Sequence, residues 1–158
     1  MKLSEFVVSE AIVAQLKSTE RDAVIEELID ALIQAGAASK AQRDELIKHI
    51  LDRENKGSTG FGKGVAVPHV KHPKIKKMAA AVGVSQSGVE LNALDKEPVY
   101  SVVLLLSPES KPDEHLQAME NIFSNLQKDQ FRRFLRQATT RDEVMDLLQE
   151  ADSQQLSG

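Results

Sequence analysis

The sequence predicts an α/β fold with α+β character, in which helices cover both faces of a β-sheet. Two apolar runs of strand length, residues 78–84 and 100–106, lie between segments that have the hydrophobic spacing of helices. The second run is apolar on both faces, as expected of an interior strand. With 158 residues the chain fits a single domain, which we expect to span residues 1–158.

Two helices are predicted in the first part of the chain. Hydrophobic residues recur at helical spacing over residues 20–35, and Gly36 stands where a left-handed C-terminal cap is needed. Ser39 followed by Gln42 is typical of a capping box, which would begin a second helix. The apolar stripe of that second helix predicts an end near Arg53.

Glycines and a proline separate these helices from the predicted sheet. Residues 57–64 contain four glycines, which break helical propensity, and the short apolar segment 65–67 stops at Pro68. Turn residues lie between the two predicted strands. They leave room for a short edge strand over residues 89–91.

Helices are expected to complete the chain. Pro112, followed by two acidic residues, is typical of the first turn of a helix. The inner face of this helix is predicted to consist of Leu116, Met119, Ile122, Phe123 and Leu126. Two shorter helices should follow, and Thr140 with Glu143 is typical of the cap of the last one.

The composition is that of an ordinary globular protein. Hydrophobic residues make up 41% and charged residues 28%, the formal net charge is -4, and cysteine is absent, which excludes disulfides and thiolate metal sites. The first residues lack the apolar run of a signal peptide. No stretch approaches the roughly 18 apolar residues that span a bilayer. We therefore expect a cytoplasmic protein that meets a membrane only through a partner.

Positive charge is concentrated in residues 53–77. This segment holds seven lysines and arginines against Glu54 alone, a net charge of +6. Such a segment around His69 would attract phosphate or an acidic partner surface. A solvated lysine-rich loop is the plainer alternative.

Residues 57–63 match the glycine and lysine spacing of a nucleotide-binding P-loop. Gly64, however, replaces the Ser or Thr whose hydroxyl holds magnesium in such a loop. The loop also leads into an apolar segment that ends at Pro68, where a phosphate-facing helix should begin. We therefore interpret the glycines as sites of tight turns and positive φ angles.

Three residues have the chemistry of a phosphoryl-transfer site. His69 ends a segment locked by Pro68, and a neutral imidazole has a lone pair for nucleophilic attack. His115 lies in the first turn of the helix opened by Pro112, where the helix dipole lowers its pKa and favours the neutral ring. Arg53 offers a planar fork of donors to a phosphoryl group. Purely structural roles are the alternative for each of these residues.

A metal site is not expected. His69 and His72 are three residues apart, but Pro68 and Pro73 prevent a regular helix between them, and carboxylate ligands close in sequence are missing. His72 is predicted to be exposed. His49 lies beside the apolar stripe of its helix, and a solvated or structural role is expected for it.

Four motifs, in order along the chain, resemble those of a known family. They are Arg53-Glu54, Ser58-Thr-Gly-Phe-Gly-Lys-Gly-Val-Ala-Val-Pro-His69, Asn92-Ala-Leu-Asp-Lys-Glu-Pro-Val99 and Asp113-Glu-His-Leu116. Together they resemble the IIA domains of the bacterial phosphoenolpyruvate-dependent phosphotransferase system, in the fructose, mannitol and nitrogen-regulatory class. The resemblance covers about residues 3–150 and implies a mixed β-sheet flanked by helices.

The resemblance also implies a site and its partners. His69 would take a phosphoryl group from the small histidine phosphocarrier protein and pass it to a IIB component, with no metal or other cofactor. His115 would be the second active-site histidine and Arg53 the arginine near the phosphorylated ring. No nucleic-acid partner is expected, and the membrane would be reached through a permease. Val70 follows the histidine where the family commonly has glycine, and Val67 replaces the more usual isoleucine.

Three roles remain open from the sequence. A carrier in sugar uptake and a regulatory module controlled by its phosphorylation both fit. The third is a binding module that kept the fold without being phosphorylated. The lack of a fused IIB segment favours regulation, whereas residues 92–95 resemble the fructose type at least as much. In the first two roles the partners are proteins, so we expect an apolar rim with Phe61 and Val70 as candidates.

Overall fold

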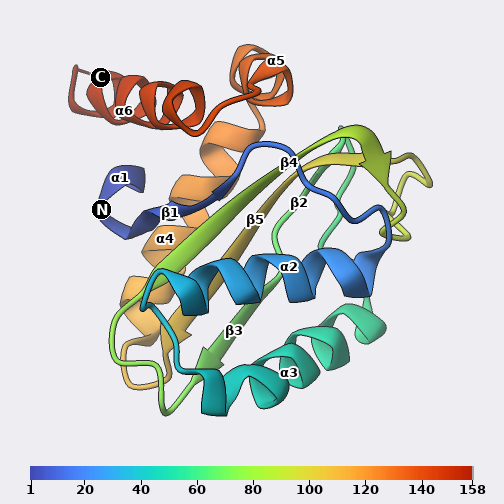
Figure 1. Ribbon diagram of the computed structural model, residues 1–158. Helices are drawn as coiled ribbons and strands as arrows, with labels where there is room; N and C mark the ends of the chain where they lie inside the picture. The colour runs from blue at the N-terminus through green and yellow to red at the C-terminus, as the bar shows by residue number, and fades with distance from the viewer. Residues whose placement is uncertain (158) are drawn as a thin grey trace.

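A mixed five-stranded sheet forms the centre of the molecule (Figure 1). The computed structural model describes residues 1–157, with side chains to residue 154. The strands are β1 (Val7–Val13), β2 (Val65–Ala66), β3 (His69–His72), β4 (Ala79–Val89) and β5 (Val99–Pro108). They follow the order β1-β4-β5-β2, and β3 also pairs with β5. Strands β4 and β5 are antiparallel, whereas the other pairs are parallel.

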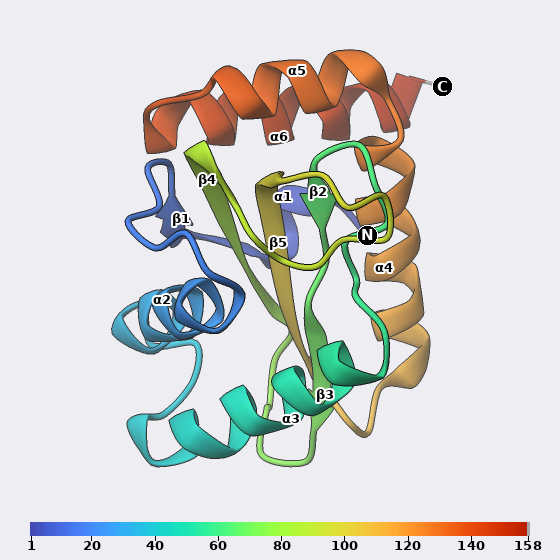
Figure 2. The same cartoon turned by 90° about the vertical axis from the view of Figure 1, so that its right-hand side faces the viewer.

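Helices cover both faces of this sheet (Figure 2). They are α1 (Leu3–Phe6), α2 (Arg21–Gln34), α3 (Arg43–Lys56), α4 (Pro112–Leu126), α5 (Asp129–Gln137) and α6 (Arg141–Ser157). One core lies between the sheet and α2 and α3, and the other lies beneath α1, α4, α5 and α6. The predicted mixed sheet with helices on both faces is therefore confirmed. Among the described residues no helix has both the length and the apolar character to cross a membrane.

Strand β5 is the interior strand that the sequence predicted. It pairs with β4 along one edge and with β2 and β3 along the other, and nine of its ten residues are buried. Alternate residues contact the two cores: Val103 and Leu105 lie in the core beneath α4, while Leu104 and Leu106 face α2 and α3. An apolar residue at almost every position is therefore required on this strand.

Several predicted helix ends are confirmed. Helix α2 ends at Gln34, and Gly36 adopts φ +82° in the turn that follows. Pro112 is the first residue of α4. The N–H of Glu143 donates to the Thr140 hydroxyl at 3.2 Å, which caps α6 as predicted.

Other predictions were wrong. A 3₁₀ turn at Lys40–Gln42 precedes α3, Ser39 makes no side-chain cap bond, and the helix runs three residues beyond Arg53. No edge strand forms over 89–91, because Val89 is the last residue of β4. Leu116 is 58% exposed, since it points away from the sheet. The sequence analysis also missed α1, β1 and β3.

The two ends of the chain are joined by one buried carboxylate. Asp152 on α6 accepts hydrogen bonds from the N–H of Leu3 at 2.7 Å, the N–H of Ser4 at 3.1 Å and the Ser4 hydroxyl at 2.6 Å. Only 4% of Asp152 is exposed. The first N–H groups of a helix have no acceptor within the helix, so the negative charge of Asp152 is favoured at the start of α1.

We predict that Asp152→Ala lowers the free energy of unfolding by about 2–3 kcal/mol, because the change leaves buried donors without an acceptor. Urea denaturation measures the effect. Asp146→Ala, at an exposed position of the same helix, is the control and should change stability by less than about 0.5 kcal/mol. Equal losses in the two variants would contradict this role of Asp152.

Candidate functional site

His69 is the first residue of β3, and backbone pairing with β5 fixes its position. Its strand pairs in parallel with β5, where His69 lies opposite Leu105, and the Leu105 N–H donates to the Pro68 carbonyl at 2.9 Å. Val65 and Val67 lie in the core beneath α4, and side chains alternate along a strand. His69 therefore points to the α4 side of the sheet, where it is half-buried.

The backbone selects one tautomer of His69. Its Nδ1 lies 2.8 Å from the carbonyl oxygen of Val67. A carbonyl can only accept a hydrogen bond, so Nδ1 carries the proton and the lone pair of the neutral ring lies on Nε2. Nε2 is thus the ring atom that is available for nucleophilic attack.

His115 lies in the first turn of α4, beside His69. The centroids of the two rings are 5.6 Å apart, with an angle of 48° between the ring planes. The Nδ1 atom of His115 lies 2.7 Å from the hydroxyl of Ser107, which is fully buried on β5. The structure therefore brings together two of the three predicted site residues.

Burial keeps both imidazoles neutral near pH 7. The pKa of His115 is lowered from 6.5 to about 4, first by burial and then by the nearby His69 and Lys71. The pKa of His115 is lowered as predicted. The causes, however, are burial and the neighbouring His69 and Lys71, whereas the sequence analysis invoked the helix dipole. Burial also lowers the pKa of His69, and Arg53 and Lys71 act in the same direction. The Val67 carbonyl and Glu54 act in the opposite direction.

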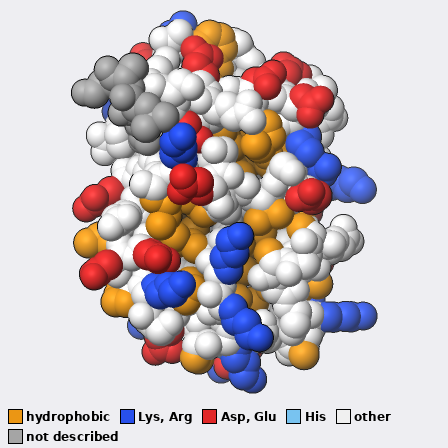
Figure 3. Space-filling model, turned by 90° about the vertical axis from the view of Figure 1, so that its left-hand side faces the viewer, with side chains coloured by type: hydrophobic (Ala, Val, Ile, Leu, Met, Phe, Trp, Pro, Cys, Tyr) orange, Lys and Arg blue, Asp and Glu red, His pale blue; other side chains and the backbone are white. Residues whose placement is uncertain are grey.

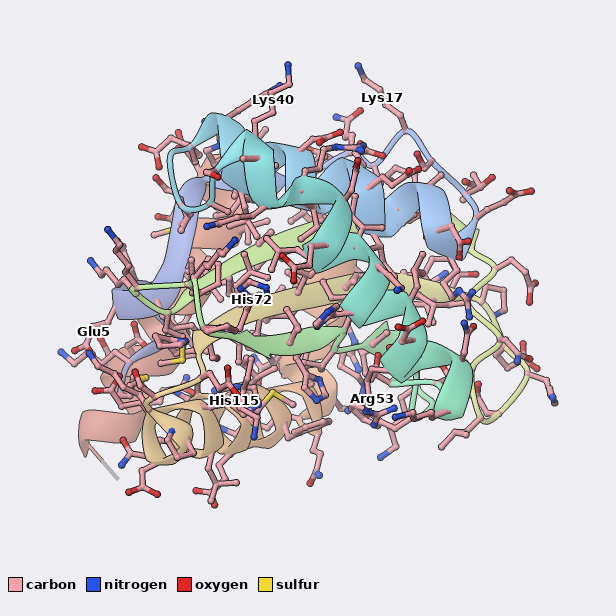
Figure 4. All side chains as sticks on the ribbon, turned by 90° about the horizontal axis from the view of Figure 1, so that it is seen from below. Glu5, Lys17, Lys40, Arg53, His72 and His115 are labelled. Atoms are coloured by element: carbon pink, nitrogen blue, oxygen red, sulfur yellow. The ribbon has the colours of Figure 1, made fainter. Side chains whose placement is uncertain are left out.

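Arg53 is exposed on the last turn of α3, close enough to influence the charge of His69. Its Nη1 donates to the carbonyl of Gly57 at 2.7 Å, which holds the guanidinium beside the residue that follows the helix. The guanidinium has further N–H donors. Figure 4 shows Arg53 near the C-terminal end of α3 and His115 on α4.

The loop between α3 and β2 is anchored by a buried carboxylate. Glu54 is only 4% exposed and accepts hydrogen bonds from the N–H and the hydroxyl of Thr59. Gly62, Lys63 and Gly64 then adopt positive φ angles, and the chain enters β2. A strand follows the glycine-rich loop, so the geometry of a P-loop is absent here.

His72 is buried, which contradicts the sequence prediction that it is exposed. Only 1% of it is accessible, and its Nε2 lies 3.3 Å from Glu45 on α3. His49 packs against it, with ring centroids 5.7 Å apart. His69 and His72 point to opposite faces of the sheet because they are an odd number of residues apart on one strand. Figure 4 shows His72 on the α3 side of β3 and His115 on the α4 side.

One of the two rim predictions was also wrong. Val70 is 9% exposed and packs in the core with α2 and α3, so it does not shape the surface around His69. Phe61 does lie on the α4 side, where it contacts Phe123 with ring centroids 5.1 Å apart. The exposed Leu116 is the neighbour of His115.

The basic segment is dispersed over the surface. The charges of Arg53 and Lys71 lower the pKa of His69. Three other lysines of the segment line a separate groove with β1 and the turn after α2, namely Lys74, Lys76 and Lys77. Figure 3 shows basic side chains in a column between hydrophobic patches on that side of the molecule. The prediction that the whole segment surrounds His69 was therefore wrong.

Sequence reasoning missed Ser107, and it gave Glu54 and Lys71 no individual contact with the site. Ser107 is a serine within an apolar strand, and a polar residue at a buried position was the available signal. Glu54 is the neighbour of Arg53 in the sequence, but its carboxylate binds the loop at Thr59. Lys71 follows His69 by two residues on a strand, so the two side chains share a face.

In the described part of the chain no group of three or more His, Asp or Glu side chains could hold a metal ion. The site instead combines a nucleophilic Nε2, a second neutral imidazole and two cationic side chains. This arrangement suits phosphoryl transfer through a histidine, because loose transfer depends on positioning and charge stabilisation. Fold and site together fit a protein that is phosphorylated on a histidine.

The chain belongs to the family of the phosphoenolpyruvate-dependent sugar phosphotransferase system, EIIA 2, whose model matches residues 5–151. The fructose-specific EIIABC component of Bacillus subtilis is 31% identical over 96% of this chain and 24% of that protein. The chain thus spans about a quarter of the length of that relative.

Regulatory proteins are similar over most of their length. A nitrogen regulatory protein of Bradyrhizobium diazoefficiens is 33% identical over 82% of each chain. The crystal structure of the nitrogen regulatory protein IIA-Ntr from Neisseria meningitidis matches with a TM-score of 0.83 at 27% identity. That match covers 92% of this chain and 98% of the other.

The lowered pKa of His115 predicts a loss of stability in acid. An unfolded histidine binds a proton near pH 6.5, whereas His115 in the folded protein does so near pH 4. Between these values the unfolded state binds more protons, so the free energy of unfolding should fall by about 2 kcal/mol from pH 7 to pH 5. Below pH 4 both states are protonated and the loss is complete.

Urea denaturation of the wild type and His115→Asn at pH 7 and pH 5 measures this term. The variant lacks the titrating ring. Its free energy of unfolding should therefore fall less than that of the wild type between pH 7 and pH 5, and the difference should be about 2 kcal/mol. Parallel losses in the two proteins would show that His115 does not contribute.

Proposed function

We propose that the chain is a phosphohistidine carrier that accepts a phosphoryl group on Nε2 of His69 from the histidine phosphocarrier protein and passes it to a IIB component. The hydrogen bond between Nδ1 and the Val67 carbonyl carries this proposal, because it leaves the lone pair of the neutral ring on Nε2. Family membership supports the same role. The chain would act as a phosphotransferase component in the cytoplasm.

Transfer to His69 exchanges one nitrogen-phosphorus bond for another. The Nε2 lone pair forms a bond to phosphorus while the bond to the donor imidazole breaks, and its electron pair stays on the donor nitrogen. In the onward step a cysteine thiolate or a histidine lone pair of the acceptor attacks phosphorus, the bond between phosphorus and Nε2 breaks, and its electron pair returns to Nε2. Arg53 and Lys71 would stabilise the charge on the phosphoryl oxygens.

While the phosphoryl group is being transferred, His115 would hold one of these oxygens as a neutral donor. If the Ser107 hydroxyl donates to Nδ1 of His115, the proton of the neutral ring lies on Nε2. This N–H can then donate to a phosphoryl oxygen without adding a full positive charge. Ser107 would be a positioning residue that acts through the tautomer of His115.

A regulatory role is the second candidate. Its support is the similarity to nitrogen regulatory proteins over most of the described chain. In that role phosphorylation of His69 would change which proteins bind the exposed surface around Leu116 and Phe61. Transfer from the phosphorylated protein to a purified IIB protein separates the two roles.

His69→Ala should abolish phosphorylation, because the attacking nitrogen is gone. Intact mass after incubation with phosphoenolpyruvate and the two general phosphotransferase proteins measures the gain of one phosphoryl group. This gain should be labile to acid, as expected of a bond to nitrogen. His72→Gln is the control and should be labelled like the wild type once circular dichroism shows that it is folded. Equal labelling of both variants would refute the assignment.

Ser107→Ala should slow phosphorylation of His69 about ten-fold, as expected for the loss of one hydrogen bond that acts on the reaction. The final extent of labelling should be unchanged, and nitrogen NMR should detect a mixture of His115 tautomers. Ser101→Ala, at another buried serine of β5, is the control and should react at the wild-type rate. An unchanged rate in Ser107→Ala would remove the positioning role.

A further inference from the structure

A basic pocket lies at the end of the sheet beneath α5, away from His69. It has a volume of about 630 Å³ and is lined by Lys63, Arg132, Arg133 and Arg136, with Asp129 as the acidic member. Four cations against one carboxylate give it a net charge of +3. The whole chain has a formal net charge of -4, so the pocket is a positively charged region on a negatively charged protein.

The pocket and the candidate site lie on the same face of the sheet but are separate. Val65 at the pocket pairs with Ser101, whereas His69 pairs with Leu105. Four residues along parallel strands correspond to about 13 Å. Figure 2 shows α5 crossing the sheet beyond the ends of β2 and β5.

Tyr100, which lines the pocket, is closely packed by its neighbours. The guanidinium carbon of Arg136 lies 3.5 Å from the centre of the Tyr100 ring. Beneath this ring are Gly64 and Gly88, where an added Cβ would come within 3.3 Å of Tyr100. Both glycines have positive φ angles, so any larger residue would be strained as well as crowded.

Arg132 and Arg136 are held by contacts within the protein, whereas Lys63 and Arg133 remain available to bind a ligand. Arg132 donates to the Leu126 carbonyl at 2.8 Å and pairs with Asp129. Lys63 and Arg133 are exposed and have no ion-pair partner among the described residues. The pocket therefore offers free donors beside fixed ones, which lowers the cost of ordering them around an anion.

We propose that this pocket binds a small molecule that carries two phosphoryl groups. Two such groups carry roughly -3 to -4 at pH 7, which matches the net charge of the lining, and arginine forks suit phosphate oxygens. A concave volume of this size fits a small molecule, since such sites span about 300–1,000 Å³. Gln86 and Gln137 also line the pocket and supply amide groups for hydrogen bonds to the rest of the ligand. This binding is independent of phosphorylation at His69.

Isothermal titration calorimetry with inorganic pyrophosphate as the probe, in 150 mM KCl, tests the proposal. We expect saturable binding at one site, and at least ten-fold weaker binding of inorganic phosphate. Arg133→Gln should weaken pyrophosphate binding about ten-fold or more, as expected when a charged hydrogen bond is lost. His69→Ala should bind like the wild type, because the pocket does not include the histidine.

Lys40→Gln is the matched control, since it removes one exposed cation on the side of the molecule that carries α2 and the start of α3 (Figure 4). It should leave the affinity unchanged. The proposal is overturned if pyrophosphate does not bind, if Lys40→Gln weakens binding as much as Arg133→Gln, or if His69→Ala abolishes it. The last result would place the anion at the histidine site.

Discussion

The parallel pairing of β3 with β5 sets the relative position of the two histidines. His69 lies opposite Leu105 in this register, and Lys71 lies opposite Ser107. Ser107 then binds His115, whose helix begins four residues after the end of β5. A slip of one residue would turn His69 to the other face, towards α2 and α3. Burial of β5 on both faces makes such a slip costly, so the core stabilises the geometry of the site.

The same pairing explains why a half-buried imidazole is tolerated beside cationic groups. His69 satisfies its Nδ1–H with the Val67 carbonyl, and His115 satisfies one ring nitrogen with Ser107. Burial lowers the pKa of both rings, so neither adds positive charge near Arg53 and Lys71 at pH 7. A neutral His69 can therefore coexist with cations that would stabilise phosphoryl oxygens.

Much of this arrangement could be predicted from the sequence, and the failures have physical reasons. Helix α2 and strand β5 have regular hydrophobic patterns, which depend only on local spacing. Strand β3 is four residues long between two prolines, so pattern alone could not reveal it. The burial of His72 and Val70 follows from the face on which His69 lies. That face is set by pairing with a strand more than thirty residues away.

A phosphoryl group on Nε2 of His69 would reverse the electrostatics of the pair. In the unmodified protein His69 and Lys71 help to lower the pKa of His115. A group with a charge of about -2, attached to a ring whose centroid lies 5.6 Å from that of His115, would favour the protonated imidazole instead. His115 would then bind the phosphoryl oxygens more strongly after transfer than before it. Release to an acceptor would return His115 to the neutral form, so protonation of His115 would be coupled to phosphorylation of His69.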